Sequence, residues 1–149
     1  KTRAESVWNG LQTVDAKNAE IIAVHDGARP LVTSEEISQT VKKAKEKGAA
    51  CLVAKVTDTI KKVENSKIIK TVDRENLRRA LTPQAFRYEI LRNAFEQTKL
   101  GEIVTDECFL VEKAGYEIVF VEGSSKNIKI THEEDLRIAE MFLKDFERK

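Results

Sequence analysis

The stretch Val24-His25-Asp26-Gly27-Ala28-Arg29-Pro30 places an acid, a glycine, an arginine and a proline directly after an apolar run that begins at Ile21. This run predicts a short buried strand that carries the polar groups at its carboxyl end. Ligands bind at this edge in open α/β sheets, and a carboxylate near a guanidinium suits a substrate with phosphate groups and a metal ion. The alternative is an ordinary strand-to-turn junction in which Asp26 accepts hydrogen bonds from nearby backbone N–H groups.

The size and composition of the chain predict that residues 1–149 form one soluble domain. With 149 residues, of which 41% are apolar and 34% are charged, the chain is long enough to form a single hydrophobic core. Its formal net charge of +1 gives no reason to expect nucleic acid or an anionic membrane as a partner, and no apolar run is long enough to cross a membrane. Cys51 and Cys108 have neither metal-ligand spacing nor an obvious partner. We therefore expect reduced thiols and a cytoplasmic protein.

Helix signals alternate with apolar strands along the first third of the chain. The capping-box patterns Thr2-x-x-Glu5 and Thr33-x-x-Glu36 each predict the start of a helix, and Gly48 predicts the end of the second one. Residues 49–56 form another apolar strand. This alternation predicts strands that pair in parallel, with helices on the faces of the sheet.

Residues 58–73 depart from this pattern. Two β-like runs, 59–63 and 67–72, flank the turn Glu64-Asn65-Ser66 and predict a hairpin. The hairpin is rich in lysine and has few residues that could fill a core. Because a lone two-stranded hairpin is marginal in water, we expect it to pack on the rest of the chain or on a second subunit. The alternative is a solvated, charged hairpin.

The second half of the chain returns to helices and strands. Residues 88–95 have apolar side chains at helical spacing, Thr105 is placed to cap a further helix, and residues 117–121 have the pattern of a strand. The pattern Thr131-x-x-Glu134 predicts the start of the last helix. Four apolar residues should form the inner face of that helix: Leu136, Ala139, Leu143 and Phe146.

Polar clusters lie at the boundaries of these predicted elements, where the active sites of α/β proteins collect. They supply arginines, a lysine, hydroxyl groups and an acid. This set suits an anionic substrate, because the cations donate charge-assisted hydrogen bonds to phosphate and the acid can bind a divalent metal. His25 and His132 lack metal-ligand spacing, so we expect no zinc site. The clusters are 3–6, 26–29, Thr59 with 73–74, 82–84, 105–106 and 123–129.

Eight short motifs follow one another along the chain: Arg-Ala-Glu-Ser-Val (3–7), Val-His-Asp-Gly-Ala-Arg-Pro (24–30), Asp-Thr-Ile-Lys (58–61), Thr-Val-Asp-Arg (71–74), Leu-Thr-Pro-Gln-Ala-Phe (81–86), Thr-Asp-Glu (105–107), Val-Glu-Gly (121–123) and Asn-Ile-Lys-Ile-Thr (127–131). In this order they closely resemble the 2-C-methyl-D-erythritol 4-phosphate cytidylyltransferase family of the non-mevalonate isoprenoid pathway. The resemblance covers essentially the whole chain. Any one motif is a weak signal, but eight in the right order are highly specific.

The resemblance implies an α/β, Rossmann-like nucleotidyltransferase fold with a mainly parallel sheet, helices on both faces and a protruding β-hairpin arm. It also implies an enzyme that transfers CMP from CTP to 2-C-methyl-D-erythritol 4-phosphate, giving 4-diphosphocytidyl-2-C-methyl-D-erythritol and pyrophosphate. Such a step depends on in-line positioning and on charge neutralisation. The implied cofactor is a divalent cation, Mg²⁺, bound to the triphosphate.

Carried over position by position, Ser6, Asp26 and Gly27 match nucleotide-binding positions. Asp26 would also lie near the second substrate and the metal, for which it is the candidate ligand. Arg29 matches a donor to the second substrate. The alternative for Ser6 is a polar residue in the first helical turn, and the alternative for Arg29 is a side chain that only pins the turn by pairing with Asp26.

The hairpin carries two further matches, Thr59 and Arg74. In the family this arm, residues 58–74 here, reaches into the neighbouring subunit of a homodimer. The resemblance therefore implies a homodimer in which Arg74 is a catalytic residue that orients the methylerythritol phosphate across the interface. A partner subunit would also stabilise a hairpin that has so little core of its own.

Three matches remain for the second substrate. Thr82 and Thr105 match hydroxyl donors, and Lys129 matches the lysine that positions the attacking phosphate, which makes it the second implied catalytic residue. The alternative for Thr105 is the role of an N-cap, which it could combine with binding. The neighbouring Lys126 is expected to be solvated.

Two features depart from the family pattern. Lys1 stands where many members have an acid near the cytosine site, so recognition of the base is expected to differ there. The Gly-rich loop that cradles the triphosphate does not occur in the sequence, so the chain resembles roughly the carboxyl-terminal two-thirds of the enzyme and is expected to be inactive alone. Two other functions stay open: a ribitol 5-phosphate cytidylyltransferase, which shares the His-Asp-x-x-Arg-Pro and Thr-Pro-Gln elements, and a non-catalytic dimerising remnant.

Overall fold

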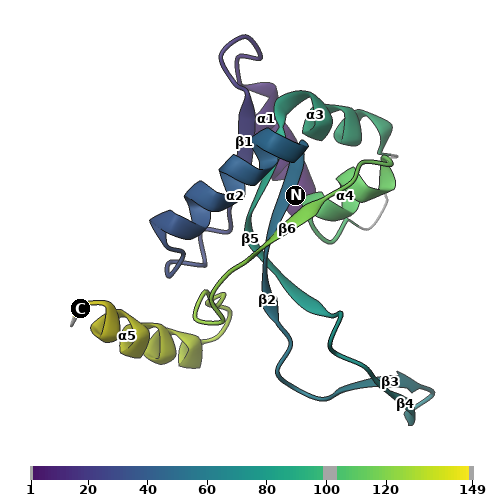
Figure 1. Ribbon diagram of the computed structural model, residues 1–149, viewed down its shortest axis with the longest axis vertical. Coiled ribbons are helices and arrows are strands. Elements are labelled where there is room, and N and C mark those ends of the chain that lie inside the picture. The colour runs from purple at the N-terminus through teal and green to yellow at the C-terminus, as the bar shows by residue number, and fades with distance from the viewer. Residues whose placement is uncertain (1, 99–103, 148–149) are drawn as a thin grey trace.

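A four-stranded sheet forms the centre of the molecule (Figure 1). The structure is a computed structural model that describes residues 2–98 and 104–147, with side chains described up to residue 144. Three strands run in the same direction, while the fourth, β5, runs antiparallel between β1 and β2. The α/β fold is confirmed, but among the described strands β2 and β6 form the one parallel pair. The strand order is β1 (Ile21–Val24), β5 (Arg78–Arg87), β2 (Ala49–Lys55) and β6 (Val119–Glu122).

Helices cover both faces of the sheet, as the sequence predicts. The cross-strand partners Ala49 and Phe86 belong to one buried cluster, and their neighbours Ala50 and Ala85 belong to another. The two clusters lie on opposite faces, because successive side chains of a strand alternate. Helices α1 (Arg3–Gln12), α3 (Tyr88–Gln97) and α4 (Glu107–Lys113) contribute to the first cluster and α2 (Ser34–Lys47) contributes to the second.

The two predicted capping boxes are confirmed. The hydroxyl of Thr2 accepts a hydrogen bond from the Glu5 N–H at the start of α1, and Thr33 makes the same contact with Glu36 at the start of α2. Gly48 ends α2 with a φ of 99°, and a Cβ at this position would stand 2.8 Å from Ile90 Cδ1. Both the backbone angle and the close approach of Ile90 therefore favour glycine there.

Strand β5 is the main element that the sequence did not predict. Thr82-Pro83-Gln84 was expected at the boundary of an element, but it lies within this ten-residue strand. A proline usually argues against a central strand, because it has no N–H to donate. Here the register of the neighbouring β2 shifts between Cys51 and Val53, opposite the proline, so the pairing is already interrupted at that point.

Two predicted helix starts are each wrong by one residue. Helix α4 begins at Glu107, so the residue before it, Asp106 rather than Thr105, is the N-cap and accepts a 2.8 Å hydrogen bond from the Phe109 N–H. The last helix, α5, spans Glu133–Glu147. Because it begins one residue later than predicted, Asp135 rather than Glu134 accepts from the free N–H groups of residues 131 and 132, at 2.8 and 2.9 Å.

The predicted inner face of α5 is mostly uncovered. Ala139 is buried, but Leu136 and Leu143 are 48% and 46% exposed, and the side chain of Phe146 lies outside the described residues. Helix α5 lies apart from the sheet (Figure 1). Apolar spacing predicts which face of a helix is apolar, but it does not predict what covers that face.

The predicted hairpin is confirmed as an arm that projects away from the sheet (Figure 1). Its strands are β3 (Ile60–Glu64) and β4 (Lys67–Val72), joined by a tight turn in which Asn65 and Ser66 both have positive φ. Two-residue turns of this kind match the twist of a hairpin. None of the described helices has the length and apolar character that crossing a bilayer requires.

Candidate active site

Asp26, just after β1, is surrounded by three cationic side chains. Its carboxylate lies 3.2 Å from Lys129 Nζ, 3.3 Å from Arg3 Nε and 3.5 Å from Arg29 Nε. Burial raises the pKa of Asp26, but the hydrogen bonds and charges of Lys129 and Arg3 outweigh this effect and hold the pKa below its ordinary value. Asp26 is therefore a carboxylate that stays ionised and gathers cations around itself.

Arg3 links Asp26 to a second, fully buried carboxylate. Its Nη1 donates a 2.7 Å hydrogen bond to Glu107 Oε1, and the Glu107 side chain has no exposed surface. Burial raises the pKa of Glu107, partly opposed by the charge of Arg3. Neither residue was assigned a role from the sequence, because only the fold brings positions 3 and 107 together; their places in the Arg-Ala-Glu-Ser-Val and Thr-Asp-Glu motifs were the available signal.

Thr82 fixes the backbone beneath this cluster. Its buried hydroxyl accepts a 3.0 Å hydrogen bond from the Asp26 N–H and lies 2.9 Å from His25 Nδ1. His25 Nε2 lies 3.1 Å from the carbonyl oxygen of Arg29. Because a backbone carbonyl only accepts, the Nε2–H donates to Arg29, while Nδ1 pairs with the Thr82 hydroxyl. The Thr82 hydroxyl thus holds the turn that carries Asp26 and Arg29.

The structure brings together four of the predicted site residues and leaves the others apart. Asp26, Arg29, Thr82 and Lys129 form one cluster. The other predicted residues have no side chain in this cluster within one chain. Ser6 donates to the carbonyl of Thr2, the residue before α1, and the backbone of Gly27 is exposed next to Asp26. Thr105 is exposed next to α4, and Thr59 and Arg74 belong to the arm, where Arg74 donates to the Thr57 carbonyl. Both readings of Arg29 stay open, since it does pair with Asp26.

The two cysteines lie together, although the sequence suggested no partner for either. Cys51 is the cross-strand partner of Gln84, and the Cys108 N–H donates a 3.0 Å hydrogen bond to the Gln84 side chain. Hydrogen bonding with Cys108 lowers the pKa of Cys51, whereas hydrogen bonding with Cys51 and burial raise the pKa of Cys108. Both thiols are free, as expected.

Lys126 also differs from the expectation of a freely solvated side chain. Its Nζ lies 5.1 Å from the centre of the Phe142 ring. This is a cation–π contact, and it ties the loop after β6 to α5.

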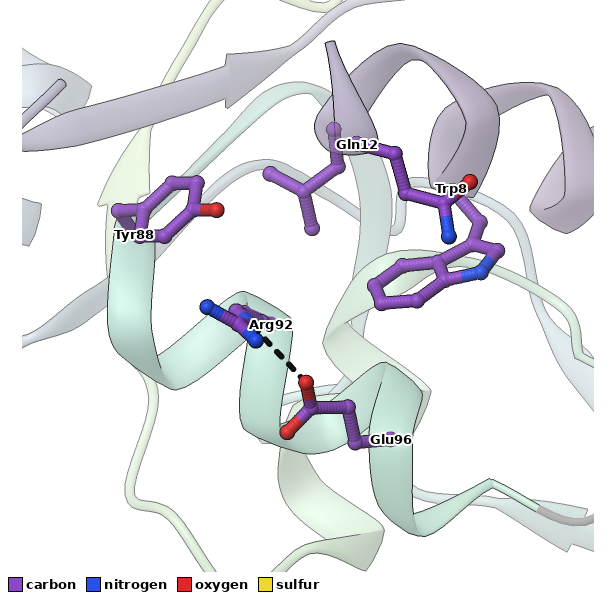
Figure 2. A pocket seen from close by; sticks show the side chains of 6 residues that line it. Trp8, Gln12, Tyr88, Arg92 and Glu96 are labelled. Carbon is purple, nitrogen blue, oxygen red and sulfur yellow. Dashed lines mark hydrogen bonds and ion pairs between the residues drawn. The ribbon is translucent and has the colours of Figure 1, made fainter. Parts of the chain in front are cut away.

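A separate hollow of about 410 Å³ lies between α1 and α3 (Figure 2). Trp8, which stacks on Phe95 with ring centres 5.3 Å apart, forms one wall. Arg92 and Glu96 pair across 2.8 Å on the other side. This hollow contains none of the predicted site residues, so the cluster at Asp26 remains the candidate active site.

With this geometry in place, comparison with known proteins identifies the family. The family described as 2-C-methyl-D-erythritol 4-phosphate cytidylyltransferase matches residues 1–145. The chain belongs to this family. The motif order that suggested it is thereby confirmed over almost the whole length of the chain.

Curated cytidylyltransferases and solved structures of the family agree. The one from Bacillus cytotoxicus is 48% identical over 142 residues, which are 95% of this chain and 62% of that protein. The one from Caldanaerobacter subterraneus subsp. tengcongensis is 47% identical over 147 residues, 95% of this chain and 63% of that protein. The crystal structure of the cytidylyltransferase from Thermus thermophilus matches with a TM-score of 0.86 and 34% identity over 96% of this chain and 70% of that one, which confirms the α/β nucleotidyltransferase fold. The chain thus spans less than two thirds of the length of these curated relatives.

Asp26 is the candidate residue for holding a divalent cation. Among the described residues, no three His, Cys, Asp or Glu side chains come together as a metal site. Mg²⁺ often takes one or two carboxylates and completes its shell with water and substrate phosphates, so a single carboxylate fits a shared site. Arg3 pairs with Oδ1 of Asp26, and both Lys129 and Arg29 pair with Oδ2, so a metal bound there would compete with these cations.

Proposed function

We propose that this chain acts in the transfer of CMP from CTP to 2-C-methyl-D-erythritol 4-phosphate, giving 4-diphosphocytidyl-2-C-methyl-D-erythritol and pyrophosphate. One observation carries the proposal: Lys129, Arg29 and Arg3 converge on Asp26 in a chain of the cytidylyltransferase family. The Lys129 side chain is 46% exposed, so its ammonium group is accessible to a phosphate from solvent.

In the proposed reaction, a phosphate oxygen of the methylerythritol phosphate attacks the α-phosphorus of CTP. A new P–O bond forms there, and the bond to the bridging oxygen breaks with pyrophosphate as the leaving group. Lys129 and Arg29 bind the attacking phosphate, because charge-assisted hydrogen bonds to phosphate are strong. Asp26 holds these cations in position before the substrate arrives, which preorganises them for the charge that develops in the transition state.

The nucleotide, metal and location are proposals of the same kind. Gly27 has open space where a Cβ would stand, which leaves its backbone accessible to a nucleotide, and Ser6 is the second proposed contact. Mg²⁺, shared between Asp26 and the triphosphate, would neutralise the charge of the leaving pyrophosphate. The bacterial relatives and the two free thiols are in keeping with a bacterial cytoplasm.

The arm supports a homodimer as part of the proposal. Arg74 and Thr59 belong to the arm, which projects away from the sheet (Figure 1), and its strands carry exposed apolar residues such as Val63 and Ile68. Contact with a second copy would cover these residues. It would also bring Arg74 to the methylerythritol phosphate in the neighbouring site, with the arm spanning residues 58–74.

Pyrophosphate release tests the proposal. The protein is incubated with CTP and Mg²⁺, in parallel with methylerythritol phosphate and with ribitol 5-phosphate. Release only with methylerythritol phosphate supports the proposal, whereas release only with ribitol 5-phosphate overturns it. If neither substrate reacts, the assay is repeated with a longer form that begins with a Gly-rich loop; activity there supports the proposal, and continued absence of activity favours a non-catalytic remnant.

A further inference from the structure

Asn127 lies in the loop between β6 and α5, and only 1% of it is exposed. Its side-chain Nδ2 donates a 3.1 Å hydrogen bond to the carbonyl oxygen of Thr82, and its backbone carbonyl oxygen accepts a 2.9 Å hydrogen bond from Arg29 Nη1. Asn127 therefore contacts two of the clustered site residues, each from a different part of the chain. A buried amide that loses such a partner is unfavourable, because water cannot replace it.

The loop that leads to Asn127 is held at its beginning by contacts with Glu36. Glu36 at the start of α2 accepts a 2.7 Å hydrogen bond from the Ser124 N–H. The same carboxylate oxygen lies 2.7 Å from the position of a Cβ on Gly123, so the chain passes Glu36 more closely than a side chain would allow. The Asn127 N–H then donates to the Ser124 carbonyl at 3.1 Å, which folds the loop back toward the sheet.

On the other side of Asn127, the chain leads directly to Lys129. The N–H of Ile130 donates a 2.8 Å hydrogen bond to the Ala28 carbonyl. Asn127 and Ile130 thus bracket Lys129 and attach its backbone to the turn that carries Asp26 and Arg29. With both attachments in place, Lys129 Nζ stands 3.2 Å from Asp26.

We propose that Asn127 is a positioning residue that places Lys129 and Arg29 for binding of the sugar phosphate, by joining the Lys129 loop to Thr82 and Arg29. The inference rests on the proposed function. Asn127 is buried beneath the cluster and acts through its neighbours, so it is not a catalytic residue. An apolar side chain could fill the same volume, but only a donor can satisfy the Thr82 carbonyl.

The test compares three single substitutions by isothermal calorimetry with methylerythritol phosphate and, separately, with CTP. Asn127→Asp keeps the size but sets a carboxylate oxygen against the Thr82 carbonyl. Asn127→Ser keeps a donor with a shorter reach and serves as the second variant if the aspartate fails to fold. Asn9→Asp makes the same change of charge at an exposed position of α1 and is the matched control.

We expect Asn127→Asp to bind methylerythritol phosphate about tenfold more weakly, the loss typical of one buried hydrogen bond, with CTP binding unchanged. Asn127→Ser should fall between this variant and the unaltered chain, and Asn9→Asp should match the unaltered chain. A merely structural role would lower the folded fraction and reduce binding of both ligands alike, which would overturn the inference, as would unchanged affinity for the sugar phosphate. If the unaltered chain does not bind both ligands, the same variants are compared in the longer form that begins with a Gly-rich loop. If that form binds neither ligand, the proposed function itself fails, and this inference fails with it.

Discussion

The sheet with its Asp26 cluster and the arm use the same kinds of residue in opposite ways. In the cluster, cationic side chains lie within 3.5 Å of one partly buried carboxylate, and the backbone around them is fixed by Thr82 and Asn127. On the arm, lysines and isoleucines are exposed along a two-stranded hairpin. The first arrangement is complete within one chain, whereas the second leaves apolar and basic groups available to a partner. The difference separates what one copy positions by itself from what a second copy would complete in the proposed homodimer.

Loss of the cluster lysine should have the largest effect. We expect Lys129→Ala to lower kcat/KM by about 10²–10³-fold, the range typical of removing one charged donor from a transition state. Lys42→Ala, at an exposed position of α2, is the control and should have normal activity. Pyrophosphate release in the active form of the protein measures both. Equal activity of the two variants would contradict the assignment of Lys129.

Mixing two weakly active variants tests whether the arm acts in the site of the neighbouring subunit. If Arg74 acts in the neighbouring site, Arg74→Ala and Lys129→Ala should each be weak alone but regain activity when unfolded together and refolded as mixed dimers. In such a dimer, one site has both substitutions and the other has none, so part of the normal activity returns. Mixing without exchange of subunits is the control. A mixture no more active than its components would place Arg74 in the site of its own chain, or outside the reaction.

Lowering the pH should show how much the ion pairs of Asp26 contribute to the free energy of unfolding. Its pKa in the folded protein lies below the ordinary value of 3.8, so its contribution to stability is present above that value and is lost as the pH falls through the lower folded value. We expect the free energy of unfolding to fall less steeply below pH 3.8 in Asp26→Asn than in the unaltered chain. Glu107, whose pKa is raised and whose contribution has the opposite sign, is common to both proteins.

Urea unfolding at a series of pH values gives these free energies. Asp58→Asn, at an exposed position, is the control and should follow the unaltered chain. Parallel curves for all three proteins would show that the contacts of Asp26 do not stabilise its ionised form.

The smallest effect should come from the arm. Ile68 is 66% exposed, and we expect Ile68→Ala to change the free energy of unfolding by no more than about 0.5 kcal/mol, as for other surface positions. Replacing Leu91, which is buried in the core, with alanine should lower the free energy of unfolding by about 2–5 kcal/mol. Measurement at low protein concentration keeps association out of the comparison. A large loss at Ile68 would mean that the arm is covered within a single chain.

Local signals in the sequence located most of the fold. Thr2 and Thr33 marked helix starts through hydrogen bonds within one turn, and Asn65 with Ser66 marked the turn of the hairpin. The sequence did not predict strand β5, because Pro83 argues against a strand unless the register of the neighbouring strand is known. That register is a property of β2, which no pattern around Pro83 can reveal.

The site divides in the same way. The motifs pointed to Asp26, Arg29, Thr82 and Lys129, because each lies within a recognisable stretch of sequence, and the structure brings these four together. The motifs could not show that Glu107 and Asn127 support them, because both partnerships join residues more than 40 positions apart. The sequence around Thr105 and Asp106 allows either side chain to be the helix cap. Only the backbone angles show that it is Asp106.

The two-stranded arm has a consequence for solubility. Each of its strands has one edge without a pairing partner among the described residues, and unpaired edges are where chains aggregate. Lysines at 61, 62, 67 and 70 line these strands, and bringing two such rows edge to edge would set like charges against each other. The lysines therefore disfavour edge-to-edge pairing of one arm with another. A partner surface of opposite charge can still bind the arm.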